Sequence, residues 1–141
     1  MSVDAGLHIT LIPDATPITA VGALIDAGWG GCANEIWLVP GDSDDIGNWV
    51  ARPHSTRQAL SELLQRFRGH GSFGVRLFHR SQANQEGGEF LGFAPSLLVF
   101  SPTINRRVAF SRTSDVTWYL AHILRALDER NLVASWEWKE C

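Results

Sequence analysis

The stretch VRLFHRSQANQEGGEFLGFAPSLLVF, residues 75–100, decides the fold class. Residues 75–79 alternate in polarity, and two apolar runs, 90–93 and 97–100, follow segments rich in glycine, proline and polar residues. Short runs of this kind, separated by turn residues, are typical of consecutive antiparallel strands. The middle of the chain is therefore predicted to form a β meander. Residues 101–105 supply turn residues, so we expect 107–111 to return as the hairpin partner of 97–100.

Three helices are predicted around this meander. Thr16 followed by Pro17 is a capping residue with proline at the first helical position, and Gly28 suits the end of that helix. Ser55 and Gln58 form a capping box before a helix that is predicted to stop at Gly69. The last helix is expected to be capped by Thr113 or Ser114 and to end near Asn131; its apolar stripe is Val116, Leu120, Ile123, Leu124 and Leu127.

Strands are also predicted at residues 7–11, 35–39 and 133–138, and the first and last of these show a period of two residues. In the last of these, Trp136 and Trp138 share a face and are expected to pack under the last helix. The element order is βαβαββββαβ. We expect an α+β fold, with a single mixed, largely antiparallel sheet of about six strands and three helices, as one domain over residues 1–141.

The composition argues against several classes of function. No apolar run approaches the roughly 18 residues that span a bilayer, and no secretory signal is visible, so we expect a cytoplasmic protein with no membrane contact. Cys32 and Cys141 are too few for a disulfide framework. The glycine-rich segment 28–32 lacks the ending of a phosphate-binding loop.

The histidines lack metal-ligand spacing, so neither a metal nor a cofactor is expected. An acid–base role would require the fold to bring such groups together, for instance His79 near Glu89 across the meander. The chain is therefore not expected to be an enzyme, and a small enzyme of unknown reaction is the third alternative.

The net charge of −3 hides a strong asymmetry along the chain. Residues 1–51 hold seven acidic residues and no lysine or arginine, and residues 52–112 hold nine arginines and three glutamates. The asymmetry fits an acidic interaction surface, and it equally fits two parts that neutralise each other in the fold. The acidic segment around Asp42, Asp44 and Asp45 is the clearest candidate contact; it starts like a calcium loop, but Ile46 and Pro53 stand where oxygen donors are needed.

Large aromatic residues accompany these carboxylates. Trp37 and Trp49 flank the acidic segment, and Glu35 precedes it. Charge complementarity next to tryptophan is a combination typical of protein-binding hot spots. A partner-binding site is therefore predicted at Asp42, Asp44, Asp45, Trp49, Trp37 and Glu35, and a solvated turn is the other interpretation of the acidic segment.

The arginines of the meander suggest an alternative. Arg76, Arg80, Arg106 and Arg107 alternate with phenylalanines, and a sheet that carries both can stack bases and follow phosphates. Alternation should place most of these phenylalanines in the core, and the net acidic charge opposes a polyanion. A single-stranded nucleic-acid-binding module is therefore the second interpretation.

The small size, the segment 42–49 and the closing Ser135-Trp136-Glu137-Trp138 strand resemble immunity proteins of bacterial polymorphic and contact-dependent growth inhibition toxin systems. The resemblance implies a protein that binds a cognate toxin domain, frequently a basic nuclease, and blocks its active site. It would make the acidic segment the toxin-facing element. The sequence leaves open whether two copies pair through an exposed strand.

Overall fold

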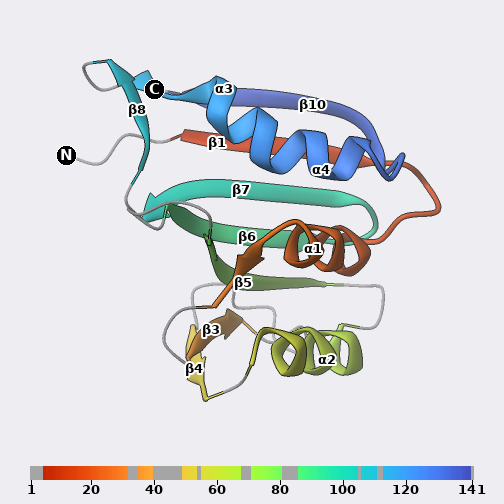
Figure 1. The fold of residues 1–141 in the computed structure, drawn as a ribbon. Coiled ribbons are helices and arrows are strands. Elements are labelled where there is room, and N and C mark those ends of the chain that lie inside the picture. Colours follow the sequence, from red (N-terminus) through yellow and green to blue (C-terminus); the bar gives the residue numbers. More distant parts are fainter. Residues whose placement is uncertain are drawn as a thin grey trace.

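The computed structural model describes residues 5–31, 35–39, 49–53, 55–67, 71–80, 86–104, 106–110 and 113–140, and it confirms the α+β class (Figure 1). Its main sheet has eight strands rather than about six. The strands follow the order β10-β1-β7-β6-β5-β3-β4, and β2 also pairs with β5. Every pairing in this sheet is antiparallel; its strands are β1 Ala5–Leu11, β2 Trp29–Gly30, β3 Ile36–Val39, β4 Val50–Arg52, β5 Ser72–His79, β6 Gly87–Phe93, β7 Leu97–Ile104 and β10 Val133–Glu140.

The predicted meander is confirmed in its order, but its last turn is wrong. β7 continues through Ser101 and Pro102 to Ile104, so these residues extend a strand instead of forming a turn. The following strand, β8 (Val108–Phe110), does not pair with β7. It pairs with β9 (Thr113–Ser114) in a separate two-stranded sheet. The short strands β2 and β4 were not predicted, since two or three residues are too few to establish an alternating pattern.

The first two helices begin where the sequence predicts. In α1 (Pro17–Asp26), Thr16 Oγ1 accepts a hydrogen bond from the Thr19 backbone N–H, and Gly28 follows the helix at a φ of 111°. In α2 (Thr56–Arg66), the predicted capping box forms, with Ser55 and Gln58 each accepting from the other's backbone N–H. These local contacts satisfy N–H groups that the first helical turn would leave without partners.

The third helical segment differs from the prediction at its start and in its middle. It consists of α3 (Val116–Tyr119), the π-helical turn η1 (Leu120–Leu124) and α4 (Arg125–Asp128) in succession. Its cap is Asp115, which accepts from the Trp118 N–H, while Thr113 and Ser114 belong to β9. Tyr119, just before the π turn, is fully buried together with Ile123 and Leu127, and the predicted stripe omits it.

The helices all cover the same face of the sheet (Figure 1). Phe73 of β5 lies on this face, and its ring contacts Phe67, the residue that follows α2. Gly92 of β6 pairs with Phe73, and a Cβ at Gly92 would meet Pro17 of α1. Phe100 contacts Tyr119 of α3 on the same face. We call this face, which carries Leu7, Ile9, Phe73, Val75, Leu77, Phe90, Leu98 and Phe100, the covered face.

Strand alternation sends the intervening side chains to the opposite face of the sheet. This face carries Trp37, Gly74, Arg76, Glu89, Leu91, Phe93, Leu97 and Val99, and Trp49 lies against it next to Gly74. None of the described helices packs on it, and we call it the open face.

Within the described parts of the chain, no helix has the length and apolar character to cross a membrane.

Both C-terminal tryptophans were expected to pack under the last helix, and only Trp138 does so. Trp138 stacks on Tyr119 with ring centroids 5.6 Å apart, whereas Trp136 is 47% exposed on the edge strand β10.

Candidate functional site

Two tryptophans enclose one arginine on the open face. The guanidinium of Arg76 lies 5.2 Å from the Trp37 ring centroid and 4.6 Å from that of Trp49. Arg76 Nε also donates to Glu89 Oε2 at 3.0 Å, across the β5–β6 pair. Cation–π contacts on both rings and a carboxylate hydrogen bond therefore hold the arginine in place.

Local sequence explains how this cluster forms. Trp37 lies between buried Ile36 and Leu38, so strand alternation directs its ring to the open face. Trp49 reaches the face because Gly74 has no side chain: a Cβ there would lie 2.9 Å from Trp49 Cη2. The resulting cluster of Trp37, Trp49, Arg76 and Glu89, which we call the aromatic–arginine cluster, is only partly shielded, with Trp37 at 37% exposure.

The open face around this cluster is largely apolar. Leu91, Phe93, Leu97 and Val99 are each half-buried, and all of them follow the alternation that points away from the helices. Neighbouring side chains of one face pack against each other across paired strands. Around the cluster the face therefore combines apolar surface with the Arg76–Glu89 ion pair, a composition suited to contact with another macromolecule.

The structure brings together only part of the predicted partner-binding site. Trp37 and Trp49 meet at Arg76, and Glu35 is exposed just before β3. Asp42, Asp44 and Asp45 lie outside the described residues.

The other described carboxylates of the acidic N-terminal third are dispersed. Asp14 precedes α1, and Asp26 ends that helix, where it accepts from Arg130 at 3.0 Å. Glu35 lies before β3, in another part of the sheet. These three carboxylates do not form one acidic patch.

The arginines of the nucleic-acid alternative do not share one surface. Arg76 lies on the open face in its ion pair with Glu89. Arg80 follows β5 and contacts Thr56 at the start of α2. Arg106 and Arg107 precede β8 near the C-terminal strand, and each pairs with a carboxylate there.

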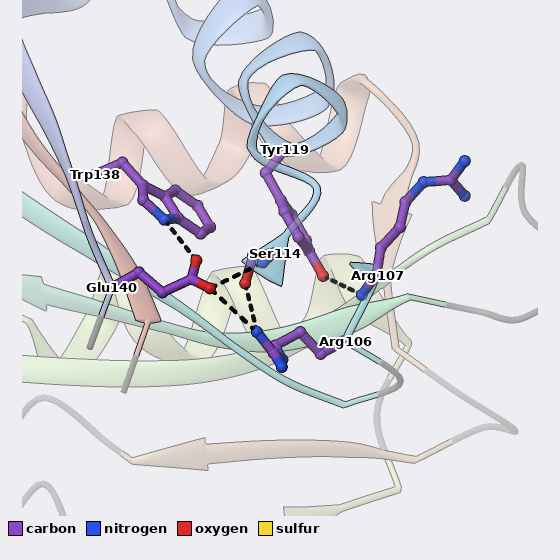
Figure 2. Close-up of polar contacts among 6 residues, drawn as sticks. All are labelled: Arg106, Arg107, Ser114, Tyr119, Trp138 and Glu140. Atoms are coloured by element: carbon purple, nitrogen blue, oxygen red, sulfur yellow. Dashed lines mark hydrogen bonds and ion pairs between the residues drawn. The ribbon is translucent and has the colours of Figure 1, made fainter. Parts of the chain in front are cut away.

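Figure 2 shows the surroundings of Arg106 and Arg107. Glu140, near the end of β10, accepts from the Ser114 backbone N–H at 2.8 Å and from Trp138 Nε1 at 3.0 Å. Arg106 Nη1 lies 3.5 Å from the same carboxylate and donates to Ser114 Oγ at 2.8 Å. Burial would raise the pKa of Glu140, but these hydrogen bonds and the nearby arginine together hold that pKa below its ordinary value. The contacts fasten the β8–β9 hairpin to β10.

Two histidines meet beneath the third helical segment. The rings of His79 in β5 and His122 in η1 lie 4.7 Å apart and almost perpendicular, and Trp118 stacks on His122 at 4.2 Å. Trp29 Nε1 donates to the His122 carbonyl at 2.9 Å, which ties β2 to the π turn. Burial, followed by the neighbouring His122, lowers the pKa of His79, although nearby Glu86 opposes the shift.

Glu86, rather than Glu89, is the carboxylate near His79. Glu89 points to the open face, whereas the Glu86 carbonyl accepts from the His79 N–H just before β6. The Glu86 side chain is 2% exposed; its Oε1 lies 3.6 Å from Arg107 Nη1, and its Oε2 has no hydrogen-bond partner among the described residues. Sequence reasoning missed Glu86, because the polar segment before β6 gives no periodic sign of burial.

Within this cluster the two ionisable side chains His79 and Glu86 are nearly closed to solvent, whereas His122 is half-buried. His79 is 6% exposed, and no group of three or more potential metal ligands occurs among the residues that the structure describes. The cluster therefore supports a role in the core, and the open face is the stronger candidate for function.

Comparison of the chain with protein-family models, with curated proteins and with solved structures finds no match.

Proposed function

We propose that this chain is a protein-binding inhibitor, an immunity protein that neutralises a cognate bacterial toxin by docking on it with the open face. The observation that carries the proposal is the aromatic–arginine cluster, in which Arg76 is held between Trp37 and Trp49.

The residue types of this cluster and the fixed position of Arg76 both support a binding role. Tryptophan and arginine are the residues that most often dominate the binding energy of protein interfaces. Arg76 is already fixed by two rings and by Glu89, so it would lose little conformational freedom when a partner docks. The half-buried apolar side chains around it would supply the rest of the contact area.

The acidic segment extends the proposal to the charge of the partner. Asp42, Asp44 and Asp45 lie in the sequence between the two tryptophans of the cluster. We propose that they oppose a basic cleft on the toxin, as in inhibition of a nuclease. Lysine substitutions at all three positions should then slow association and reduce its salt dependence, since such charges act mainly on the association rate.

The ion pairs favour a protein partner over single-stranded nucleic acid. Arg76, Arg106 and Arg107 each already bind a carboxylate of this chain. A phosphate would have to displace those carboxylates, and the overall charge of −3 would oppose its approach.

Co-expression with the product of the neighbouring gene tests the proposal. The C-terminal domain of that product is expressed in a sensitive host with the wild-type chain, with Trp37→Ala/Trp49→Ala, or with Trp136→Ala. Trp136 is the matched control, because it is 47% exposed but lies on β10, away from the cluster. Each variant's unfolding is measured in parallel.

We expect the wild type and Trp136→Ala to restore growth and the double variant to fail while it stays folded. Affinity for the purified domain should fall at least about 30-fold in the double variant, the effect of losing one hot spot worth about 2 kcal/mol. If the wild type gives no protection, the inhibitor proposal is wrong. If all three proteins protect equally, the docking face is wrong.

A further inference from the structure

The described arginines divide into two groups by their partners. Seven lie within ion-pair distance of a carboxylate, namely Arg52, Arg66, Arg76, Arg106, Arg107, Arg125 and Arg130. Arg57 and Arg80 make no ion pair with any described carboxylate. These two are the exceptions in a chain whose other described arginines are all neutralised.

Both exceptions line the same pocket. This pocket has a volume of about 270 Å³ and lies between the end of α1, β2 and the first turn of α2. Arg57 and Arg80 border it together with the hydroxyl-bearing residues Ser55 and Thr56, and none of the described residues that line it is acidic. Two arginines that have no carboxylate partner among the described residues and line one concave site favour an anion.

The position of Arg80 is set by the chain around it. Its Nη2 lies 3.5 Å from Thr56 Oγ1, which also accepts from the Gly31 N–H at 3.1 Å. The guanidinium lies against Gly30 of β2, where a Cβ would be only 2.6 Å from Nη2. A glycine at position 30 therefore gives Arg80 the space to lie beside the pocket.

We propose that this pocket binds the phosphate group of a small phosphorylated molecule. A phosphate oxygen pair can accept from a guanidinium fork, and its remaining oxygens can accept from a second guanidinium or from hydroxyls. Ile25 and Trp29 provide an apolar wall for the rest of the ligand. The volume falls just below the roughly 300–1,000 Å³ typical of small-molecule sites, so a compact phosphate ester fits better than a nucleotide.

The site is separate from the proposed docking face, because α1, α2 and Trp29 belong to the covered side of the sheet. Binding of phosphate and binding of a toxin are therefore measured independently, and either can fail alone.

Nuclear magnetic resonance titration tests the proposal. The wild-type chain is titrated with inorganic phosphate and with glycerol phosphate, and sodium chloride keeps the ionic strength constant. The variants are Arg80→Gln, Gly30→Ala and Arg57→Gln/Arg80→Gln. Arg125→Gln is the control, because Arg125 is an exposed arginine on α4 that is paired with Glu129. Gly30→Ala keeps both charges but should push the flexible guanidinium of Arg80 out of position.

We expect saturable shifts at residues around the pocket and tighter binding of glycerol phosphate than of inorganic phosphate. Arg80→Gln should weaken binding at least about tenfold, as expected for a lost hydrogen bond to a charged group. Gly30→Ala should weaken it less, and Arg125→Gln should bind like the wild type. Shifts that sodium chloride alone reproduces, or undiminished binding by the double variant, would overturn the site. Equal or weaker binding of glycerol phosphate would overturn the assignment to a phosphate ester.

Discussion

The two faces of the sheet are built by the same strands but differ in the burial of their side chains and in whether helices cover them. On the covered face, Phe73, Phe90 and Phe100 are fully buried beneath the helices. On the open face, Trp37 is 37% exposed beside an ion-paired Arg76. Alternation along each strand thus separates residues that stabilise the fold from residues available to a partner. This division predicts that substitutions on the two faces affect different measurements.

The largest effect on stability is expected at Trp29. Its ring contacts His79, Phe90, Phe100 and Trp118, with ring centroids 5.2–6.4 Å away, at the centre of the covered side. Trp29→Ala would leave a large cavity and the His122 carbonyl without its donor, so the free energy of unfolding should fall by about 3–5 kcal/mol. Denaturation by urea measures this. A loss below about 1 kcal/mol would contradict the central packing of Trp29.

Two glycines on neighbouring strands provide a matched comparison of the faces. A Cβ at Gly92 would collide with the Phe73 ring and with Pro17 at the start of α1, whereas a Cβ at Gly74 would meet the partly exposed side chains of Trp49 and Leu91. Gly92→Ala should cost about 1–3 kcal/mol, because a packed core resists added volume. Gly74→Ala should cost less than about 1 kcal/mol, because Trp49 can move outward. Urea denaturation distinguishes them, and equal losses would show that the faces do not differ as described.

Buried His79 on the covered face should make stability depend on pH below its ordinary pKa. Burial lowers the pKa of His79 from its ordinary value of 6.5, so the unfolded chain takes up a proton at a higher pH than the folded chain does. The free energy of unfolding should therefore decrease as the pH falls below about 6.5. His79→Phe should flatten this decrease. An unaltered profile in His79→Phe would assign the effect to another group.

The smallest effect on stability is expected at Trp37. Its partial exposure means that Trp37→Ala should lower the free energy of unfolding by no more than about 1 kcal/mol. Thermal unfolding alongside a binding assay checks this. A loss of several kcal/mol would indicate that the open face serves the core, and it would remove the basis for the docking proposal.

The sequence predicts best those elements whose signals are local. The capping box of Ser55 and Gln58 and the Thr16-Pro17 start of α1 need only neighbouring residues, and both are confirmed. The π turn in the last helix was missed; its His122 carbonyl accepts from Trp29 Nε1, a contact between residues 93 apart in the chain that no local pattern indicates. β2 was missed for a similar reason, since its pairing with β5 is a tertiary contact.

The candidate site shows the same limit. Trp37 and Trp49 could be selected as binding residues because large aromatics beside charges are typical of interfaces. Arg76 was assigned to nucleic acid, and its position between these two rings depends on the pairing of β3 with β5, which the sequence does not reveal. Glu86 and Glu89 are only three residues apart, yet the first carboxylate is buried and the second lies on the open face with Arg76.

Fluorine resonance of the chain labelled with 5-fluorotryptophan tests the docking of the open face most directly. The six tryptophans give six reporters, assigned by single Trp→Phe variants. On addition of the toxin domain, the signals of Trp37 and Trp49 should shift, while those of buried Trp29 and edge-strand Trp136 stay in place. A shift of the Trp136 signal with those of Trp37 and Trp49 unmoved would contradict the account.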